Sequence, residues 1–140
     1  MAAKTKPRKT NTYRKGQSGM RPWGEWRVVD VGDGFTVKRI VVAAGQRLSL
    51  QRHFGRAEHW FVVAGLGKVT LGTRTRRVAA GDAIDIPVRL AHRLENVGDV
   101  PLTLVEIQFG TLLDEADIER IADDYRRVSL GTKARTRQAS

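Results

Sequence analysis

Short runs of alternating apolar and polar residues make up most of this chain. Between residues 26 and 109 these runs recur at intervals of roughly ten residues, with turn-forming residues between them. A period of two is typical of strands that bury one face, and Gly72-Thr73 between two such runs indicates a hairpin. The expected strands cover residues 26–30, 35–43, 47–53, 59–64, 68–71, 74–79, 82–87, 92–96 and 102–109.

Eight or nine short strands at this spacing predict an all-β fold, either a sandwich or a small barrel. The helical stretches that a parallel βαβ sheet needs between its strands are absent from the pattern. At 140 residues the chain has room for one such domain.

One amphipathic C-terminal α-helix is expected after the strands, over residues 114–128. Asp114 is a suitable N-cap residue, and Ile118, Ile121, Ala122 and Tyr125 recur at the spacing of one helical face. We expect this helix to pack on the outside of the β-domain or against a second subunit.

The net charge of +10 is concentrated in the two ends of the chain. Residues 1–20 carry six Lys or Arg and residues 129–140 carry three, with no acidic residue in either segment, whereas residues 21–128 carry 16 basic and 15 acidic residues. We therefore expect a domain over residues 21–128 between two disordered basic tails. Such tails can contact nucleic acid weakly, but a solubilising role is the simpler expectation.

The complete lack of cysteine excludes a disulfide framework, a zinc ribbon and thiol catalysis, and it fits a cytoplasmic location. The basic start has no apolar core of a secretory signal, and no apolar run is long enough to span a bilayer. We therefore expect no membrane partner.

The histidines His53 and His92 stand within two spaced motifs. These motifs are Gly45-x5-Gln51-x-His53-x4-Glu58-x6-Gly65 and Gly81-x5-Pro87-x4-His92-x3-Asn96. They resemble the paired motifs of the cupin superfamily, in which the first motif supplies two histidines and a glutamate and the second supplies another histidine. The resemblance implies a small cupin-type β-barrel (a double-stranded β-helix, or jelly roll) and one metal ion bound by Gln51, His53, Glu58 and His92.

Strand geometry agrees with this resemblance. Residues two apart on a strand point to the same face, so Gln51 and His53 are expected to point together into the barrel. Gln51 stands where most cupins have their first histidine. Two imidazoles, a carboxylate and an amide oxygen suit a divalent ion; we place Zn²⁺ first, with Mn²⁺, Co²⁺, Ni²⁺ or Fe²⁺ left open. The alternative for each histidine is a core residue that binds no metal.

Five separated blocks carry a narrower resemblance: RPWG at 21–24, TVKRI at 36–40, LSLQ at 48–51, RAEHW at 56–60 and HRLEN at 92–96. They look like the C-terminal cupin domain of type II mannose-6-phosphate isomerases, which often follows a mannose-1-phosphate guanylyltransferase domain. The resemblance implies interconversion of mannose 6-phosphate and fructose 6-phosphate. That reaction needs a metal that polarises the sugar oxygens, a base, and cationic groups for the phosphate.

Glu106 is the expected base, because it shares strand parity with Leu102 and Leu104 and so faces an apolar interior. A structural ion pair is the alternative. The expected phosphate-binding residues are Lys38, Arg47, Arg56 and Arg93.

Three positions depart from the family pattern. Phe54 and Gly55 replace histidines, and Arg89 replaces a glycine. We expect metal binding to survive these changes and turnover to suffer if a missing imidazole relays a proton. The alternatives are therefore a non-catalytic sugar- or metabolite-binding cupin, or a metal-dependent dioxygenase. Since cupins are often dimers, a homodimer is expected.

Overall fold

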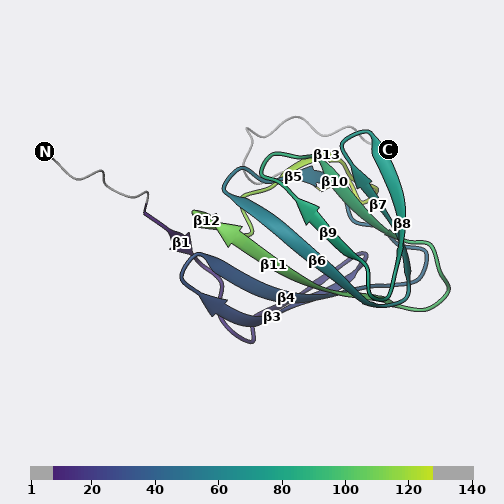
Figure 1. The fold of residues 1–140 in the computed structure, drawn as a ribbon, viewed down its shortest axis with the longest axis horizontal. Coiled ribbons are helices and arrows are strands. Elements are labelled where there is room, and N and C mark those ends of the chain that lie inside the picture. The colour runs from purple at the N-terminus through teal and green to yellow at the C-terminus, as the bar shows by residue number, and fades with distance from the viewer. Residues whose placement is uncertain (1–7, 128–140) are drawn as a thin grey trace, which may run out of the picture.

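The computed structural model describes residues 8–127, which form thirteen β-strands and no helix (Figure 1). The larger sheet has the order β2 (Ser18–Arg21), β3 (Gly24–Gly32), β4 (Phe35–Val42), β11 (Leu102–Gly110), β6 (Arg56–Ala64) and β9 (Ala83–Ile86). The smaller sheet has the order β13 (Glu119–Ala122), β5 (Leu50–Arg52), β10 (His92–Asn96), β7 (Leu66–Leu71) and β8 (Arg74–Ala79). A short parallel pair, β1 (Thr10–Asn11) and β12 (Leu112–Leu113), completes the fold.

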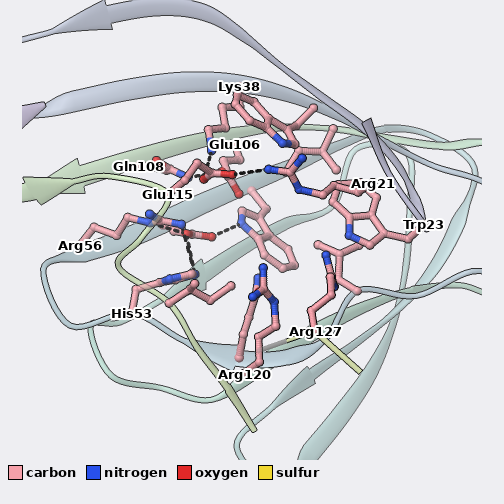
Figure 2. A pocket seen from close by; sticks show the side chains of 17 residues that line it. Arg21, Trp23, Lys38, His53, Arg56, Glu106, Gln108, Glu115, Arg120 and Arg127 are labelled. Carbon is pink, nitrogen blue, oxygen red and sulfur yellow. Dashed lines mark hydrogen bonds and ion pairs between the residues drawn. The ribbon is translucent and has the colours of Figure 1, made fainter. Parts of the chain in front are cut away.

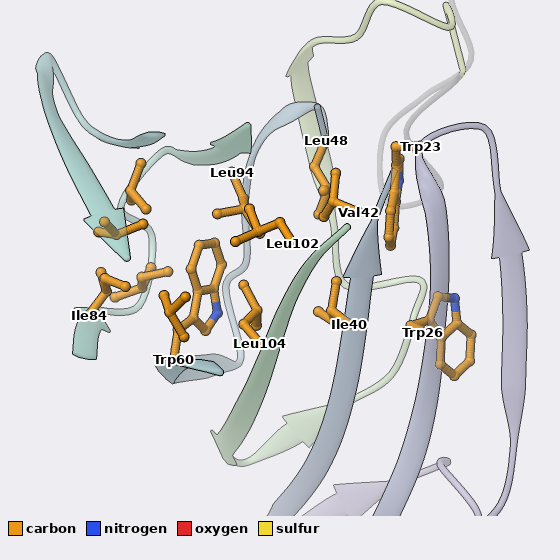
Figure 3. Close-up of a cluster of buried hydrophobic side chains, with 14 of the residues drawn as sticks. Trp23, Trp26, Ile40, Val42, Leu48, Trp60, Ile84, Leu94, Leu102 and Leu104 are labelled. Atoms are coloured by element: carbon orange, nitrogen blue, oxygen red, sulfur yellow. The ribbon is translucent and has the colours of Figure 1, made fainter. Parts of the chain in front are cut away.

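The two main sheets enclose one apolar core (Figure 3). Alternate residues of β6 point inward, so that Trp60 and Val62 are buried while Phe61 remains half exposed. Leu94 and Val69 of the smaller sheet belong to the same cluster. Period-two burial on both sheets confirms the all-β prediction.

Each of the nine expected strands corresponds to an observed one, and Gly72 lies in the β7–β8 hairpin with a left-handed φ of 60°. The expected barrel is not closed, because among the described residues no strand is shared between the sheets. The fold is thus a two-sheet, cupin-like arrangement. Residues 8–127 also offer no helix that could cross a membrane.

The prediction of a helix over residues 114–128 is wrong. Asp114 does cap a turn, since its carboxylate accepts a hydrogen bond from the backbone two residues on, but the chain then continues as β13, antiparallel to β5. The Asp117 carboxylate accepts hydrogen bonds from the N–H groups of Phe54 and Gly55, at 3.0 and 2.8 Å. These contacts hold the segment beside β5. The backbone groups of β13 then form hydrogen bonds with the edge strand β5.

The folded unit begins before residue 21, where the charge pattern placed its boundary. β1 and β2 belong to the fold, and Tyr13 between them is buried, with its ring edge-on to Trp26 at 6.1 Å. There was little indication in the sequence that these residues belong to the fold, because Tyr13 is the only aromatic residue among many basic ones in residues 1–20. The remaining parts of the expected tails, residues 1–7 and 129–140, lie outside the described residues, as does residue 128.

Two strand neighbourhoods position the functional side chains. β10 lies between β5 and β7, so that His92 is directly opposite Gln51. β11 lies between β4 and β6, so that Glu106 is opposite both Lys38 and Trp60. The inward faces of these strands converge on one pocket between the sheets.

Candidate metal centre and ligand pocket

The side chains of His53, Glu58 and His92 meet in the interior. Each residue is at most 3% exposed, and one ligand atom from each lies within 4.8 Å of the other two. Glu58 comes from β6 and His92 from β10, while His53 directly follows β5. The fold thus brings together three of the four expected ligands from β6, β10 and the residue after β5.

Hydrogen bonds fix the orientation of both imidazoles. Nδ1 of His53 lies 2.6 Å from the carbonyl oxygen of Asp117, and Nδ1 of His92 lies 2.9 Å from that of Leu90. Because a carbonyl only accepts, each Nδ1 carries the proton and each Nε2 presents a lone pair. These Nε2 atoms lie 3.3 and 3.9 Å from the Glu58 carboxylate, and that of His92 has no hydrogen-bond partner among the described residues.

Burial keeps both imidazoles neutral. It lowers the pKa of His53 to about 4, with a further contribution from the Arg56 guanidinium, and it also lowers the pKa of His92. Burial acts to raise the pKa of Glu58, but the influence of His53 and Arg56 outweighs it and holds that pKa well below its usual range. Two lone pairs therefore face one carboxylate, an arrangement that a cation stabilises.

Two further residues of β6 hold Glu58 in place. Arg56 Nε donates to Oε2 at 2.9 Å, and Trp60 Nε1 donates to Oε1 at 2.9 Å. Arg56 Nη2 also lies 3.3 Å from His53 Nε2. The sequence analysis did not predict this hydrogen bond, although the two-residue spacing of Trp60 from Glu58 indicates a shared face.

Gln51 lines the same pocket. Its Oε1 accepts a hydrogen bond from Ser49 Oγ at 3.0 Å. An amide oxygen has two lone pairs, so one remains for a cation, and Gln51 as a fourth ligand stays a prediction.

A second group of ionisable side chains lines the opposite wall (Figure 2). Lys38 Nζ donates to Glu115 Oε2 and to Tyr13 Oη, both at 2.9 Å, and lies 4.5 Å from the centroid of the Trp26 ring. Burial acts to raise the pKa of Glu115, but the Lys38 ammonium outweighs it and brings that pKa down to about 2. Lys38 and Glu115 therefore form an ion pair inside the pocket wall.

Glu106 lies in this pocket too and is 3% exposed. Burial and the negative charge of Glu58 raise the pKa of Glu106 to about 8. Gln108 Nε2 donates to Glu106 Oε1. The inward position agrees with the strand parity, and the role as a base stays a prediction.

Two of the four expected phosphate-binding residues lie elsewhere. Lys38 and Arg56 line the pocket, but Arg47 donates to Asp124 at 2.7 and 2.9 Å, and Arg93 donates to two backbone carbonyls. Arg47 precedes the start of β5, so the two-residue alternation does not extend to it. Both side chains instead hold the C-terminal segment against the smaller sheet.

The three departures from the family pattern lie beside the centre. Phe54 is half exposed and lies 5.3 Å from the Arg52 guanidinium. A Cβ on Gly55 would come within 2.4 Å of Leu112 Cβ, so a larger residue here requires that side chain to move. Arg89 has the left-handed φ of 72° that a glycine would adopt, so this turn keeps its shape.

Several residues of the pocket wall escaped the sequence analysis because they follow Asp114. Asp117 holds His53, Glu115 pairs with Lys38, and Arg120 lines the pocket. The assignment of this segment to an external helix hid them. The one available signal was the density of charged residues after the last long strand.

The donor set fits a divalent transition metal. Neutral imidazoles and a carboxylate are typical ligands of such ions. A bound ion would also give a partner to the buried His92 Nε2.

The chain is similar to a known protein family and to curated proteins. Residues 8–123 match the family model described as "Mannose-6-phosphate isomerase C-terminal". The chain is 47% identical over 108 residues to the mannose-1-phosphate guanylyltransferase of Escherichia coli K12, which covers 77% of this chain and 23% of that protein. It is also 47% identical over 109 residues to the alginate biosynthesis protein AlgA of Pseudomonas aeruginosa, covering 78% and 23%. The chain thus spans about a quarter of these curated relatives.

Solved structures with the same fold include cupins. The Schizosaccharomyces pombe Cnp3 cupin domain superposes with a TM-score of 0.60 at 14% identity, over 61% of this chain and 64% of that one. The oxalate decarboxylase of Lactobacillus farciminis gives a TM-score of 0.66 at 22% identity, over 75% and 33%. A Bacillus subtilis oxalate decarboxylase, described as having Mn(II) centres, gives 0.64 at 22% identity, over 72% and 29%.

These relatives correct the expected activity. Curated relatives that are 44–47% identical to the chain are named for guanylyltransferase activity or for alginate and xanthan biosynthesis, and the expectation of a mannose-6-phosphate isomerase is wrong on that evidence. The resemblance identified the correct family of domains, but the isomerase activity inferred from the name of that family was not supported by the names of the relatives. By sequence, the chain belongs to the mannose-6-phosphate isomerase C-terminal family, and its fold is like that of the cupin domain of Cnp3.

Proposed function

We propose that this chain is a metal-binding cupin domain whose pocket takes a phosphorylated sugar. The observation that carries the metal is the pair of neutral imidazole Nε2 atoms that face Glu58 in the interior, one of them without a hydrogen-bond partner within residues 8–127. The ligand class is supported by the relatives, whose names refer to mannose phosphates.

In this proposal His53, Glu58 and His92 hold the ion, with Gln51 as the fourth ligand. A bound divalent ion would act as a Lewis acid toward sugar oxygens. Glu106 faces the same space and is the candidate for proton transfer or for a hydrogen bond to the sugar. Zn²⁺ stays the first choice of metal, and Mn²⁺, Co²⁺, Ni²⁺ and Fe²⁺ stay open.

Metal analysis of purified variants tests the proposal. We expect about one divalent ion per wild-type chain and a strong loss in His53→Ala and His92→Ala, because ligand number sets affinity. The third histidine provides a matched control: His59 lies on the outer face of β6, where Nδ1 is 2.6 Å from Asp85 Oδ1, so His59→Ala should keep the metal. Equal metal content in all four proteins would overturn the metal site.

We also propose a homodimer through the outer face of the larger sheet. Phe61 and Val63 of β6 and Ile107 and Phe109 of β11 expose apolar side chains on two paired strands there, each 38–47% exposed. Light scattering of the purified protein tests this, and a monomer would contradict it.

We also infer a cytoplasmic location, which the lack of cysteine favours. The weak nucleic-acid contacts expected of the basic tails concern residues 1–20 and 129–140, and residues 1–7 and 129–140 of these lie outside the described residues.

A further inference from the structure

Arg56 is a buried cation within the candidate metal centre. Its side chain is 5% exposed, and each of its three nitrogen atoms donates a hydrogen bond inside the protein (Figure 2). Nε donates to Glu58 Oε2 at 2.9 Å, Nη1 to the carbonyl oxygen of Asp114 at 3.2 Å, and Nη2 to His53 Nε2 at 3.3 Å. Arg56 thus contacts two of the residues proposed to bind the ion.

The contact between Arg56 and His53 excludes a metal bond from the same imidazole nitrogen. His53 Nδ1 donates to the carbonyl oxygen of Asp117 at 2.6 Å, so Nε2 is the acceptor nitrogen of a neutral ring. This nitrogen has a single lone pair, which lies in the plane of the ring. The lone pair can accept a hydrogen bond from Arg56 Nη2 or coordinate an ion, but it cannot do both at once.

The other two ligand residues can bind an ion with Arg56 in place. A carboxylate has about four lone-pair sites, so Glu58 can keep its hydrogen bond from Arg56 while it binds a cation. His92 Nε2 lies 3.9 Å from Glu58 Oε1 and has no hydrogen-bond partner in the part of the chain that the structure describes. Binding by all three residues therefore requires Arg56 Nη2 to leave His53.

A guanidinium N–H group released from His53 needs a new partner. A buried charged donor without a hydrogen bond destabilises the protein, and an anionic oxygen is a strong acceptor for it. Lys38 and Arg56 both line the pocket, but Lys38 Nζ already donates to Glu115 and Tyr13, both at 2.9 Å. Of these two expected phosphate-binding residues, Arg56 is therefore the one whose donor becomes free when an ion binds to His53.

We propose that Arg56 exchanges partners when an ion binds. Its Nη2 leaves His53 Nε2, turns into the pocket and donates to a phosphoryl oxygen of the ligand, while Nε stays on Glu58. Because coupling between two binding sites is reciprocal, the ion and the phosphorylated ligand should each strengthen the binding of the other. The exchange rests on the proposed function for the ion and for the class of ligand, and it adds one arginine that couples the two.

Metal affinity tests the first half of the exchange. Arg56→Met removes the competing donor and keeps a long side chain, so the Kd for Zn²⁺ should fall by roughly 10- to 100-fold, the effect of removing a competing hydrogen bond from a charged group. Arg56→Lys keeps a cation beside Glu58 in case the first variant does not fold, and it should show a smaller fall in Kd. Competition with a chromogenic chelator measures the Kd, and thermal unfolding shows whether each variant is folded.

Arg39→Met is the matched control, because it removes one positive charge from an exposed position of β4. It should bind Zn²⁺ like the wild type. If the folded Arg56 variants bind Zn²⁺ no more tightly than Arg39→Met does, Arg56 only supports Glu58, and the exchange is overturned while the proposed metal site stands. A wild-type protein that binds no metal would instead overturn the proposed function.

Calorimetric titration with mannose 6-phosphate and with mannose tests the second half. The Zn²⁺-loaded wild type should bind mannose 6-phosphate roughly 10- to 100-fold more tightly than Zn²⁺-loaded Arg56→Met, whereas mannose should bind both alike because it has no phosphoryl group. Removal of the metal with a chelator should abolish this difference, since Arg56 then stays on His53.

Equal binding of mannose 6-phosphate by the two loaded proteins would overturn the exchange, because the released donor would then not reach the phosphoryl group. If the loaded wild type binds mannose 6-phosphate no more tightly than mannose, the ligand class of the proposed function falls as well.

Discussion

A buried imidazole nitrogen with its lone pair directed at a carboxylate is costly for a folded protein. An unsatisfied buried polar atom destabilises by about 1–3 kcal/mol. In the part of the chain that the structure describes, His92 Nε2 is such an atom, and Glu58 keeps its charge nearby. Because a cation would relieve both groups, the cost at the level of one residue is an argument for a ligand that binds there.

Trp60 offers a prediction at the same scale. Trp60→Phe removes the hydrogen bond to Glu58 Oε1 and leaves the ligands themselves unchanged. Groups that orient a metal ligand typically contribute 10- to 100-fold to affinity, so metal affinity should fall by about that factor. Competition with a chromogenic chelator measures it.

Trp26→Phe is the control, because the Trp26 Nε1 atom is buried without a hydrogen-bond partner in the described residues. It should leave the metal affinity unchanged. An equal loss in both variants would mean that general packing, and not the bond to Glu58, sets the affinity.

Among the elements, the strands were predictable from the sequence, whereas the conformation of residues 114–127, the C-terminal strap, was not. Strand positions follow from the local alternation of side chains, and the motif spacing marked His53, Glu58 and His92 on separate strands. The strap has a helical spacing of apolar residues, but hydrogen bonds from Phe54 and Gly55 to Asp117 decide its conformation. Such long-range contacts leave no trace in a local pattern, so Glu115 and Arg120 were missed.

The fastening of the strap can be measured with a double-mutant cycle on Arg47 and Asp124. Their bidentate ion pair is about 40% exposed on both sides, so we expect a coupling below about 1 kcal/mol in the free energy of unfolding. Arg47→Ala should have a larger effect on local opening, seen as faster amide exchange over residues 119–127. Unchanged exchange there would show that the pair does not hold the strap.

For the whole molecule, the Lys38–Glu115 pair predicts how stability depends on pH. Its carboxylate has a folded-state pKa near 2, below the ordinary value of 4.5. A depressed carboxylate pKa stabilises the fold above the unfolded value, and this contribution is lost as the pH falls from about 4.5 toward about 2. The groups that face this carboxylate are Lys38, Tyr13 and Arg21.

Denaturant unfolding at several pH values checks this expectation. The free energy of unfolding should decrease with falling pH in that window, and Glu115→Gln should flatten the slope. Asp33→Asn, at an exposed turn of the larger sheet, serves as the control and should keep the wild-type slope. A Glu115→Gln protein with an unchanged slope would assign the acid sensitivity to other carboxylates.

The chain order of the strap has a consequence for how the protein matures. During synthesis the ribosome releases β5, β6 and β10, with all the candidate ligands, before residues 114–127 emerge. An ion could therefore reach the nascent centre before residues 114–127 dock, which brings Arg120 to the pocket and the carbonyl of Asp117 to His53 Nδ1. Metal that enters before the strap docks would leave slowly afterwards, so the content of the mature protein would record the ions present at translation more than those met later.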